Sequence, residues 1–339
     1  MRRKLTPFIA AGMGILLLIL DSRTAIHGAQ IGIELCIYTV IPSLFPFIVL
    51  TGILTPAICG TKSRILSPIG KLCGMPQGSE GIFISSILGG YPTGALSIHQ
   101  AWKSGQLRSA DARRMLAFCS NAGPAFIFGI LGNKFSNAAS LWLLWGIHII
   151  SAVLVAILIP KKDEQRGTIV SPPVPTLAQS VKNAVLSMGY ICGWIVLFRV
   201  ILAFCERWFL WLLPTSLQVI LCGLLELANG CIGLDAVSSM GTRFTLCSAM
   251  LAFGGACIVM QTASVTGKLG LGLYLPGKLL QMVLSILLSY FTQWICFPTV
   301  EEAKIHPVFI TMLLFFVGLF ALLARKKKIR GSIPQLFGV

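Results

Sequence analysis

The sequence predicts an all-α polytopic membrane protein, and three observations lead to this fold class. The chain has 339 residues, of which 55% are hydrophobic and only 11% are charged. A soluble domain carries roughly 25% charged residues, which it needs to cover its surface. Disorder is excluded as well, because disordered chains have low hydrophobicity. Finally, apolar runs that suit a bilayer-spanning helix, which needs about 20 residues, recur along the chain.

Eight of these runs are expected to cross the membrane, which gives about eight transmembrane helices. The first follows Arg2-Arg3-Lys4 and also fits a signal peptide, but no small-residue cleavage pattern comes after it, so we expect a retained anchor helix. The eight runs are Pro7–Leu20, Ile31–Leu54, Met115–Leu131, Ala138–Ile159, Asn183–Cys205, Ser248–Thr266, Tyr274–Phe297 and Pro307–Leu323.

Two further apolar runs are interrupted, and we expect each to form a re-entrant helical hairpin. The first hairpin, at 79–98, contains Gly89-Gly90-Tyr91-Pro92-Thr93-Gly94, and the second, at 216–234, contains Glu226-Leu227-Ala228-Asn229-Gly230. Glycine, proline and polar residues in the middle of an apolar run break a helix. At membrane depth, a broken backbone is tolerated only where protein or a water-filled cavity satisfies its polar groups.

The basic residues predict the orientation, because cytoplasmic loops of membrane proteins are enriched in Lys and Arg. With the N-terminus in the cytoplasm and each hairpin returning to its own side, the cytoplasmic segments hold 20 Lys and Arg residues and the other side holds five. We therefore expect a multi-pass protein of the cell membrane with both termini in the cytoplasm. The net charge of +16 then reports orientation in the lipid bilayer and does not indicate a nucleic-acid partner.

An internal repeat organises the chain. The tetrapeptide Met-Leu-Ala-Phe occurs at 115–118 and at 250–253, and each copy follows an interrupted hairpin and precedes a small or polar break. Because each unit makes three full crossings, the second unit must be inverted, which is typical of secondary transporters with a substrate site between the repeats. The expected organisation is an anchor helix (1–30), a first gate-type repeat (31–159), a cytoplasmic linker (160–182), a second, inverted repeat (183–298), and a final helix with a basic tail (299–339).

If the two hairpin tips and the two broken spans converge, their polar side chains line one cavity. Broken helices expose N–H groups, whose partial positive charge favours anions. Glu226, the only acid among these residues, could carry a proton, coordinate Na⁺ or accept a donor group of the substrate. A single Ser or Thr has an equal alternative role in close helix packing. The candidate substrate-binding residues are Thr93, Ser120, Asn121, Glu226, Asn229, Gln261, Thr262 and Ser264.

A second set of residues is expected to shape the helix breaks, with Tyr91 and Pro92 in a structural role. Glu34 and Arg199 occupy corresponding spans, where they either pair or extend separately to the interface. Arg199 could instead meet an anionic substrate. The expected helix-break residues are Gly90, Tyr91, Pro92, Gly94, Gly123, Pro124, Gly230, Gly254 and Gly255.

Other classes of activity have no signal in the sequence. No spacing typical of a metal site is visible, and no cofactor is indicated. Zincin, nucleophile-elbow and P-loop motifs are missing, so we expect neither an enzyme nor an ATP-driven pump. The coupling ion, H⁺ or Na⁺, stays open, and so does a homo-oligomer.

Four motifs together resemble the sporulation integral membrane proteins of the YlbJ/SpoVV type. They are Pro42-Ser43-Leu44-Phe45-Pro46-Phe47 and the segments 90–95, 120–126 and 226–230, and the resemblance runs from about residue 31 to 300. That family belongs to a group with nucleoside-recognition (gate) domains, similar to concentrative nucleoside transporters. The resemblance implies transport of dipicolinic acid across the outer forespore membrane, out of the mother cell. It also implies that the solute contacts include Thr93, Ser120, Asn121, Glu226 and Asn229.

Three alternatives stay open at this point. The first is a small anionic solute such as dipicolinate, although a carboxylate at Glu226 is awkward for a dianion unless it is protonated or bound to a cation. The second is a nucleoside or another small solute carried by the same architecture. The third is a membrane scaffold for spore formation that transports nothing.

Overall fold

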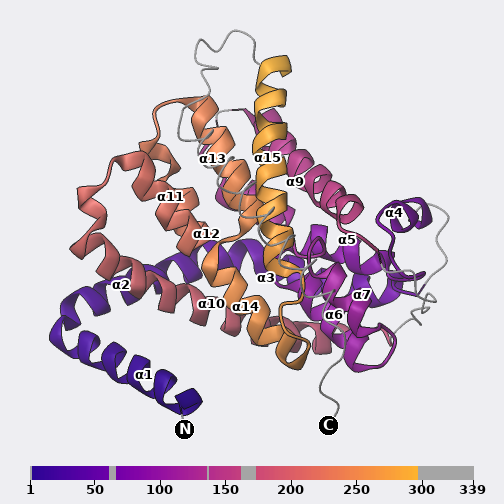
Figure 1. The fold of residues 1–339 in the computed structure, drawn as a ribbon, viewed down its shortest axis with the longest axis horizontal. Coiled ribbons are helices and arrows are strands. Elements are labelled where there is room, and N and C mark those ends of the chain that lie inside the picture. The colour runs from indigo at the N-terminus through magenta and orange to yellow at the C-terminus, as the bar shows by residue number, and fades with distance from the viewer. Residues whose placement is uncertain (1, 61–65, 136, 162–172, 297–339) are drawn as a thin grey trace, which may run out of the picture.

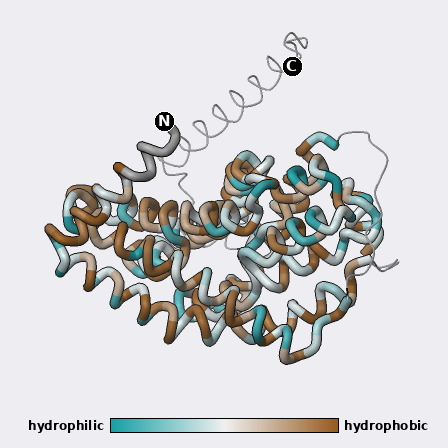
Figure 2. The backbone as a smooth tube through the Cα atoms, turned by 90° about the horizontal axis from the view of Figure 1, so that it is seen from below, coloured by the Kyte–Doolittle hydropathy of each residue, from teal (hydrophilic) through white to brown (hydrophobic). Residues whose placement is uncertain are grey.

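The computed structural model describes residues 2–60, 66–135, 137–161 and 173–296 (Figure 1). Within these ranges every regular element is a helix, and hydrophobic residues recur along the helices (Figure 2). Five helical segments in the described part of the chain are long and apolar enough to cross a membrane. The all-α polytopic fold class is therefore confirmed. The five segments are Ser22–Ile58, Ala138–Leu158, Leu177–Trp208, Met240–Leu269 and Tyr274–Gln293.

The number of spans stays a prediction. The expected anchor forms α1 (Arg2–Leu20). The expected span Met115–Leu131 is divided between two short helices, α7 (Ser109–Met115) and α8 (Pro124–Ile130), which non-helical residues connect. The last expected span, Pro307–Leu323, lies outside the described residues.

The first long span extends beyond the apolar run that predicts it. α2 (Ser22–Leu35) continues through a π-helical turn at Cys36–Val40 into α3 (Ile41–Ile58). The helix begins at Ser22 because the Asp21 carboxylate accepts a hydrogen bond from the Thr24 N–H at 3.4 Å. Such a cap satisfies one of the N–H groups that the first turn of a helix leaves free.

The longest helix, α10 (Leu177–Trp208), begins inside the residues expected to form the linker. The Thr176 hydroxyl accepts a hydrogen bond from the Gln179 N–H at 3.3 Å and so caps the helix. The linker expected at 160–182 therefore ends before Leu177. Hydropathy alone placed the boundary too late, because the first turns of α10 mix polar and apolar residues rather than being uniformly apolar.

Helix α10 packs antiparallel along α2 and the first part of α3. At one end Arg207 forms an ion pair with Asp21 at 2.8 Å. At the other end the Ser180 hydroxyl donates to the Val49 carbonyl at 2.6 Å. Between these points Gly32 lies against the α10 backbone, where any side chain would be crowded. Small residues of this kind let membrane helices approach closely.

The remaining helices are short or interrupted, and the interruptions fall at the expected residues. The chain leaves the helix between α5 and α6 at residues 90–92, and α11 meets α12 at Glu226. Helices α13 and α14 meet at Gly254, whose φ of +85° is in the left-handed region that glycine tolerates. Helix α15 lies between α9 and α13 (Figure 1). The bounds are α4 (Ser67–Leu72), α5 (Glu80–Gly89), α6 (Thr93–Lys103), α9 (Ala138–Leu158), α11 (Thr215–Leu225), α12 (Leu227–Ile232), α13 (Met240–Phe253), α14 (Gly255–Thr266) and α15 (Tyr274–Cys296).

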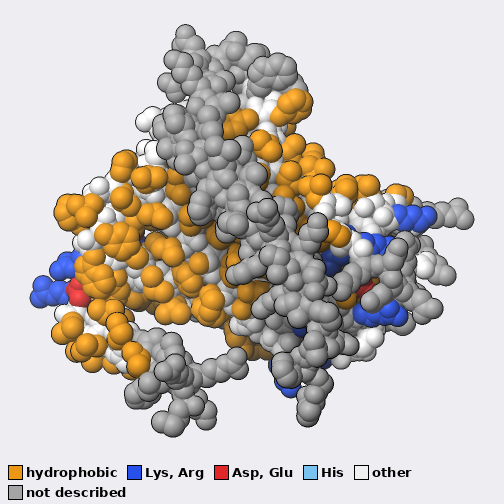
Figure 3. Space-filling model, in the orientation of Figure 1, with side chains coloured by type: hydrophobic (Ala, Val, Ile, Leu, Met, Phe, Trp, Pro, Cys, Tyr) orange, Lys and Arg blue, Asp and Glu red, His pale blue; other side chains and the backbone are white. Residues whose placement is uncertain are grey.

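Charged side chains lie at the margins of an apolar surface. Figure 3 shows hydrophobic side chains over most of the visible described surface, with Lys and Arg at its left and right edges. Lys134 forms an ion pair with Asp235, and Arg243 donates to the Val237 carbonyl at 2.9 Å. The charge pattern places both Lys134 and Arg243 on the non-cytoplasmic side. In the structure the loops that carry them also lie close together. Which face is cytoplasmic stays a prediction.

Arg114 holds two helix ends together at the opposite side of the protein. Its side chain is buried, and its guanidinium donates to the carbonyls of Cys73, Gly74 and Ala156 at 2.9, 3.2 and 2.6 Å. These carbonyls lie at the C-terminal ends of α4 and α9. The last carbonyls of a helix have no intrahelical donor, and the helix dipole favours a cation there. Arg114 therefore satisfies groups that the fold would otherwise bury unpaired.

We expect Arg114→Met to destabilise the folded protein. Methionine keeps the apolar stem but leaves buried carbonyls without donors, at a cost of about 1–3 kcal/mol for each group. The apparent unfolding temperature of the purified protein in detergent should fall by about 5–10 °C. Lys103→Met, at an exposed position of α6, is the control and should leave the temperature unchanged. An Arg114→Met variant as stable as the control would contradict the assigned role.

Candidate functional site

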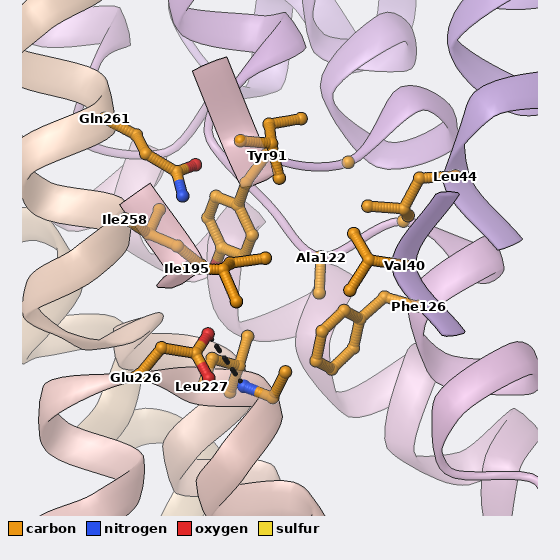
Figure 4. A pocket seen from close by; sticks show the side chains of 14 residues that line it. Val40, Leu44, Tyr91, Ala122, Phe126, Ile195, Glu226, Leu227, Ile258 and Gln261 are labelled. Atoms are coloured by element: carbon orange, nitrogen blue, oxygen red, sulfur yellow. Dashed lines mark hydrogen bonds between the residues drawn. The ribbon is translucent and has the colours of Figure 1, made fainter. Parts of the chain in front are cut away.

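The broken helices meet around one cavity in the protein core (Figure 4). The volume available to the centre of a water molecule is about 40 Å³, which is enough for a few waters. Most of the wall is apolar, and polar side chains come from Tyr91, Glu226 and Gln261. The lining residues are Val40, Leu44, Gly90, Tyr91, Ala122, Gly123, Phe126, Ile191, Ile195, Glu226, Leu227, Ala228, Ile258 and Gln261.

Both hairpin breaks and both broken spans contribute to this wall. In the first half, a Cβ on Gly90 would lie 3.0 Å from the Gly123 nitrogen, so the two breaks touch through their backbones. In the second half, a Cβ on Gly255 would lie 2.9 Å from the Gly223 carbonyl oxygen. In each half, therefore, the hairpin and the broken span pack so closely that the contact has room only for glycine, which has no Cβ.

Glu226 caps the helix that begins directly after it. The side chain is 3% exposed. Oε1 accepts a hydrogen bond from the Ala228 N–H at 3.1 Å, and Oε2 accepts from the N–H and the side-chain amide of Asn229 at 2.8 and 2.6 Å. The carboxylate thus sits on the positive N-terminal end of α12. This helix end binds the protein's own anion and is not vacant for an anionic solute.

Tyr91 connects the first hairpin to the broken span of the second half. Its ring lines the cavity, and its hydroxyl donates to the Leu251 carbonyl at 2.8 Å. Leu251 lies in the last turn of α13, where the break at Gly254 leaves carbonyls without helical donors. Tyr91 therefore has a polar role between two breaks, in addition to the packing role expected from the sequence.

Asn121 lies behind the cavity wall and holds the first broken span in place. Its side-chain amide donates to the Ser86 hydroxyl at 3.1 Å and to the Phe118 carbonyl at 2.8 Å. Its Oδ1 accepts a hydrogen bond from the Gln281 amide at 3.2 Å. All of these contacts are buried, so Asn121 joins α5, the broken span and α15 in one polar network.

Lys278 lies beside this site, although none of the motifs marks it. It is 0% exposed on α15, and its Nζ donates to Gln281 Oε1 at 2.6 Å and to the Tyr91 hydroxyl at 3.3 Å. Its position inside the apolar run 274–297 is the signal that could have identified it. Ionisable residues within membrane spans are functional candidates by default.

The other candidate residues differ in whether they line the cavity. Gln261 lines it. Thr93 donates to the Gly90 carbonyl at 2.7 Å and so closes the turn at 90–93 that precedes the rest of α6. Ser120 and Thr262 are fully buried, and both hydroxyls lie beside the hydroxyl of the buried Tyr274. Ser264 is exposed and donates back to its own helix, so it does not line the cavity.

The expected break residues serve mainly as close-packing points and helix starts. Gly94 lies so near the Cys119 carbonyl oxygen that a Cβ would overlap it, and Gly230 packs in the same way against Gly223. Pro124 begins α8 and Pro92 immediately precedes α6. A proline is well suited to these positions because it lacks the N–H that the first turn leaves unpaired.

Arg199 pairs with a residue of its own helix. Its Nη2 donates to Glu206 Oε2 at 3.0 Å, while Glu34 is exposed. Among the described residues no ion pair joins Glu34 to Arg199. Arg199 is also not part of the cavity wall. In the part of the chain that the structure describes, no group of three or more His, Cys, Asp or Glu side chains could hold a metal ion.

The fold and this site define an all-helical, polytopic membrane protein whose interrupted helices enclose a small central cavity. Comparison with known proteins gives one relative by sequence, the sporulation integral membrane protein YlbJ of Bacillus subtilis (strain 168). It is 23% identical over 291 residues, which cover 73% of this chain and 71% of that protein. No family model matches the chain, and no solved structure matches it significantly. The similarity to YlbJ supports the resemblance inferred from the four motifs.

Proposed function

We propose that this protein is a permease that moves a small anionic solute across a bacterial membrane during sporulation. One observation carries the proposal: in the described part of the chain, both hairpin breaks and both broken spans line the same pocket, and most of its lining residues are buried. Secondary transporters bind their substrates at such places, between discontinuous helices near the middle of the membrane. The similarity to a sporulation integral membrane protein supports the cellular setting.

The proposed solute is dipicolinic acid, moved across the outer forespore membrane with both protein termini in the cytoplasm. A flat aromatic ring suits apolar walls such as those formed by Val40, Phe126 and Ile258 (Figure 4). The cavity has room only for a few waters, so binding requires it to widen. Movement of the hairpins against the long helices would open it, as lids and gates do in other proteins.

We further propose the inverted-repeat organisation that the sequence pattern predicts. The first spans of the two expected repeats, α3 and α10, lie side by side and run in opposite directions. Each half also brings one hairpin break against one broken span through glycine backbones. These two features are what an inverted pair of similar units would produce.

A nucleoside or another neutral solute is the second candidate, and the polar groups of the cavity favour it. Glu226 and Gln261 offer oxygen acceptors that suit hydroxyl or amine donors of a solute. A dianion next to Glu226 needs either a proton or a cation on that carboxylate. The three hydrogen bonds that Glu226 accepts reduce this repulsion but do not remove it.

The test is uptake into lipid vesicles that contain the purified full-length protein. We expect saturable uptake of labelled dipicolinate and no uptake into vesicles without protein. Uptake of labelled nucleosides instead would replace the first candidate by the second. If folded protein moves neither solute, the transport proposal fails and a membrane scaffold for spore formation becomes the better explanation.

A further inference from the structure

Lys278 is a fully buried amine whose contacts are all uncharged. Its Nζ has two hydrogen-bond partners, Gln281 Oε1 and the Tyr91 hydroxyl, and no carboxylate contacts it in the described part of the chain. The other ionisable side chains that face it are Cys119 and His148. A buried charge without a partner is costly, so a lysine in this place needs an explanation.

The neighbours of Lys278 present only acceptors to it. Gln281 uses its amide N–H on Asn121, so its carbonyl oxygen faces Lys278. Tyr91 donates its one hydroxyl proton to the Leu251 carbonyl, so its oxygen accepts from Lys278. An ammonium group has three N–H donors and no acceptor, and these two neighbours accept two of the three.

His148 adds no competing charge from α9. Its Nε2 accepts a hydrogen bond from the Ala122 N–H at 2.9 Å, so that nitrogen carries no proton and the ring is neutral. The third N–H of the Lys278 ammonium has no acceptor among the described residues. A protonated Lys278 therefore has an unused donor directly behind Tyr91, whose ring forms part of the cavity wall.

The other groups of positive charge expected for an anion are capped or do not reach the cavity. Arg199 donates through Nη2 to Glu206, its Nε and Nη1 have no hydrogen-bond partner among the described residues, and it is not part of the cavity wall. The N-terminal end of α12 is capped by Glu226. A cavity with one carboxylate and no cation would repel an anionic solute, so the counter-charge must come from another group.

We propose that Lys278 is an anion subsite that binds a carboxylate group of the solute. This proposal rests on the proposed function and names the part of the site that recognises the acidic end of the solute. A displacement of the Tyr91 side chain opens the path between the cavity and Nζ. The solute carboxylate then accepts the unused N–H and supplies the negative charge that the buried ammonium lacks.

The test compares an aromatic carboxylate with its neutral amide. Binding of radiolabelled benzoate and benzamide to the full-length protein in lipid nanodiscs is measured by equilibrium dialysis, together with dipicolinate. Lys278→Met should lower the affinity for benzoate at least about tenfold and change that for benzamide by less than about twofold. Lys182→Met, which removes the same charge from an exposed position on α10, should leave both affinities unchanged.

Each outcome decides for or against the subsite. Equal losses for benzoate and benzamide indicate a packing role for Lys278 and overturn the proposal, as does unchanged benzoate binding. If Lys278→Met does not fold, Lys278→Gln replaces it. If neither variant folds, the unmodified protein decides: a preference for benzoate over benzamide supports the proposal, and equal affinity for the two overturns it. If benzoate binding depends on Lys278 but dipicolinate is neither bound nor taken up, the anion subsite is supported and the proposed transport of dipicolinate is rejected.

Discussion

Replacing Glu226 by alanine is expected to abolish solute uptake and to destabilise the second hairpin. The carboxylate accepts three hydrogen bonds from Ala228 and Asn229, so its loss removes the cap of α12 and leaves buried N–H groups unpaired. Loss of a helix cap typically costs about 1 kcal/mol, and unpaired buried groups add to this. Uptake into vesicles and the apparent unfolding temperature in detergent measure the two effects.

Two further variants separate the structural role of Glu226 from its contact with the solute. Aspartate is also a good helix cap, so Glu226→Asp should remain folded with nearly normal stability. Because its carboxylate is shorter by one methylene, it withdraws from the cavity, and uptake should fall at least about tenfold. Glu226→Gln should reach the membrane at a normal level but lose function, because its side-chain NH2 group is a donor and cannot accept the hydrogen bonds that one carboxylate oxygen accepts at the helix break. Full uptake by both variants would show that Glu226 serves only as a cap.

Replacing Gly94 by valine is expected to prevent the protein from folding. A Cβ at this position overlaps the Cys119 carbonyl oxygen and comes close to Ser86. The obstacle is backbone that belongs to the broken span, so α6 would have to move away from the cavity wall. Overpacking in a core typically costs about 1–3 kcal/mol, and we expect a value at or above the upper end here because no flexible side chain can move aside.

The yield of monodisperse protein after gel filtration measures this effect. Gly94→Val should give little or none, and Gly94→Ala should give protein with a lower unfolding temperature. Gly146→Ala in α9 is the matched control, because no atom lies within 4 Å of the added Cβ. The control should be neutral or slightly stabilising, since alanine favours helices more than glycine does. A normal yield of Gly94→Val would mean that the hairpin and the broken span are not packed as described.

The positions of the helix breaks could be predicted because they depend on short stretches of sequence. Residues 90–92 contain glycine and proline, which interrupt a helix in almost any surroundings. Glu226 interrupts its run for a different local reason, since its carboxylate binds the N–H groups of the next turn. Boundaries that depend on a single capping side chain were harder to place, as the early start of α10 at Leu177 shows.

The partners of the polar residues could not be predicted, because they depend on how the helices are rotated and packed. Hydropathy suggested that Arg199 could meet Glu34 or an anion, yet it bonds to Glu206 along its own helix. The pattern of broken helices suggested that the N–H groups at the helix breaks are exposed, yet at α12 the Glu226 carboxylate binds them. Ser264 is a polar residue next to a predicted helix break, yet it is exposed and does not line the cavity. The rotation of α14 directs Gln261 toward the cavity instead.

The sequence by itself determined that this protein is helical, crosses a membrane several times and breaks its helices at particular residues. These properties follow from hydropathy and from the local conformations that glycine, proline and capping side chains permit. Only the tertiary structure decided which polar groups surround the cavity. Lys278 and Tyr91 are far apart in the chain and share a hydrogen bond, because helix packing brings α15 against the first hairpin. Contacts between such distant segments depend on the fit of whole helix surfaces, and no local pattern of residues encodes them.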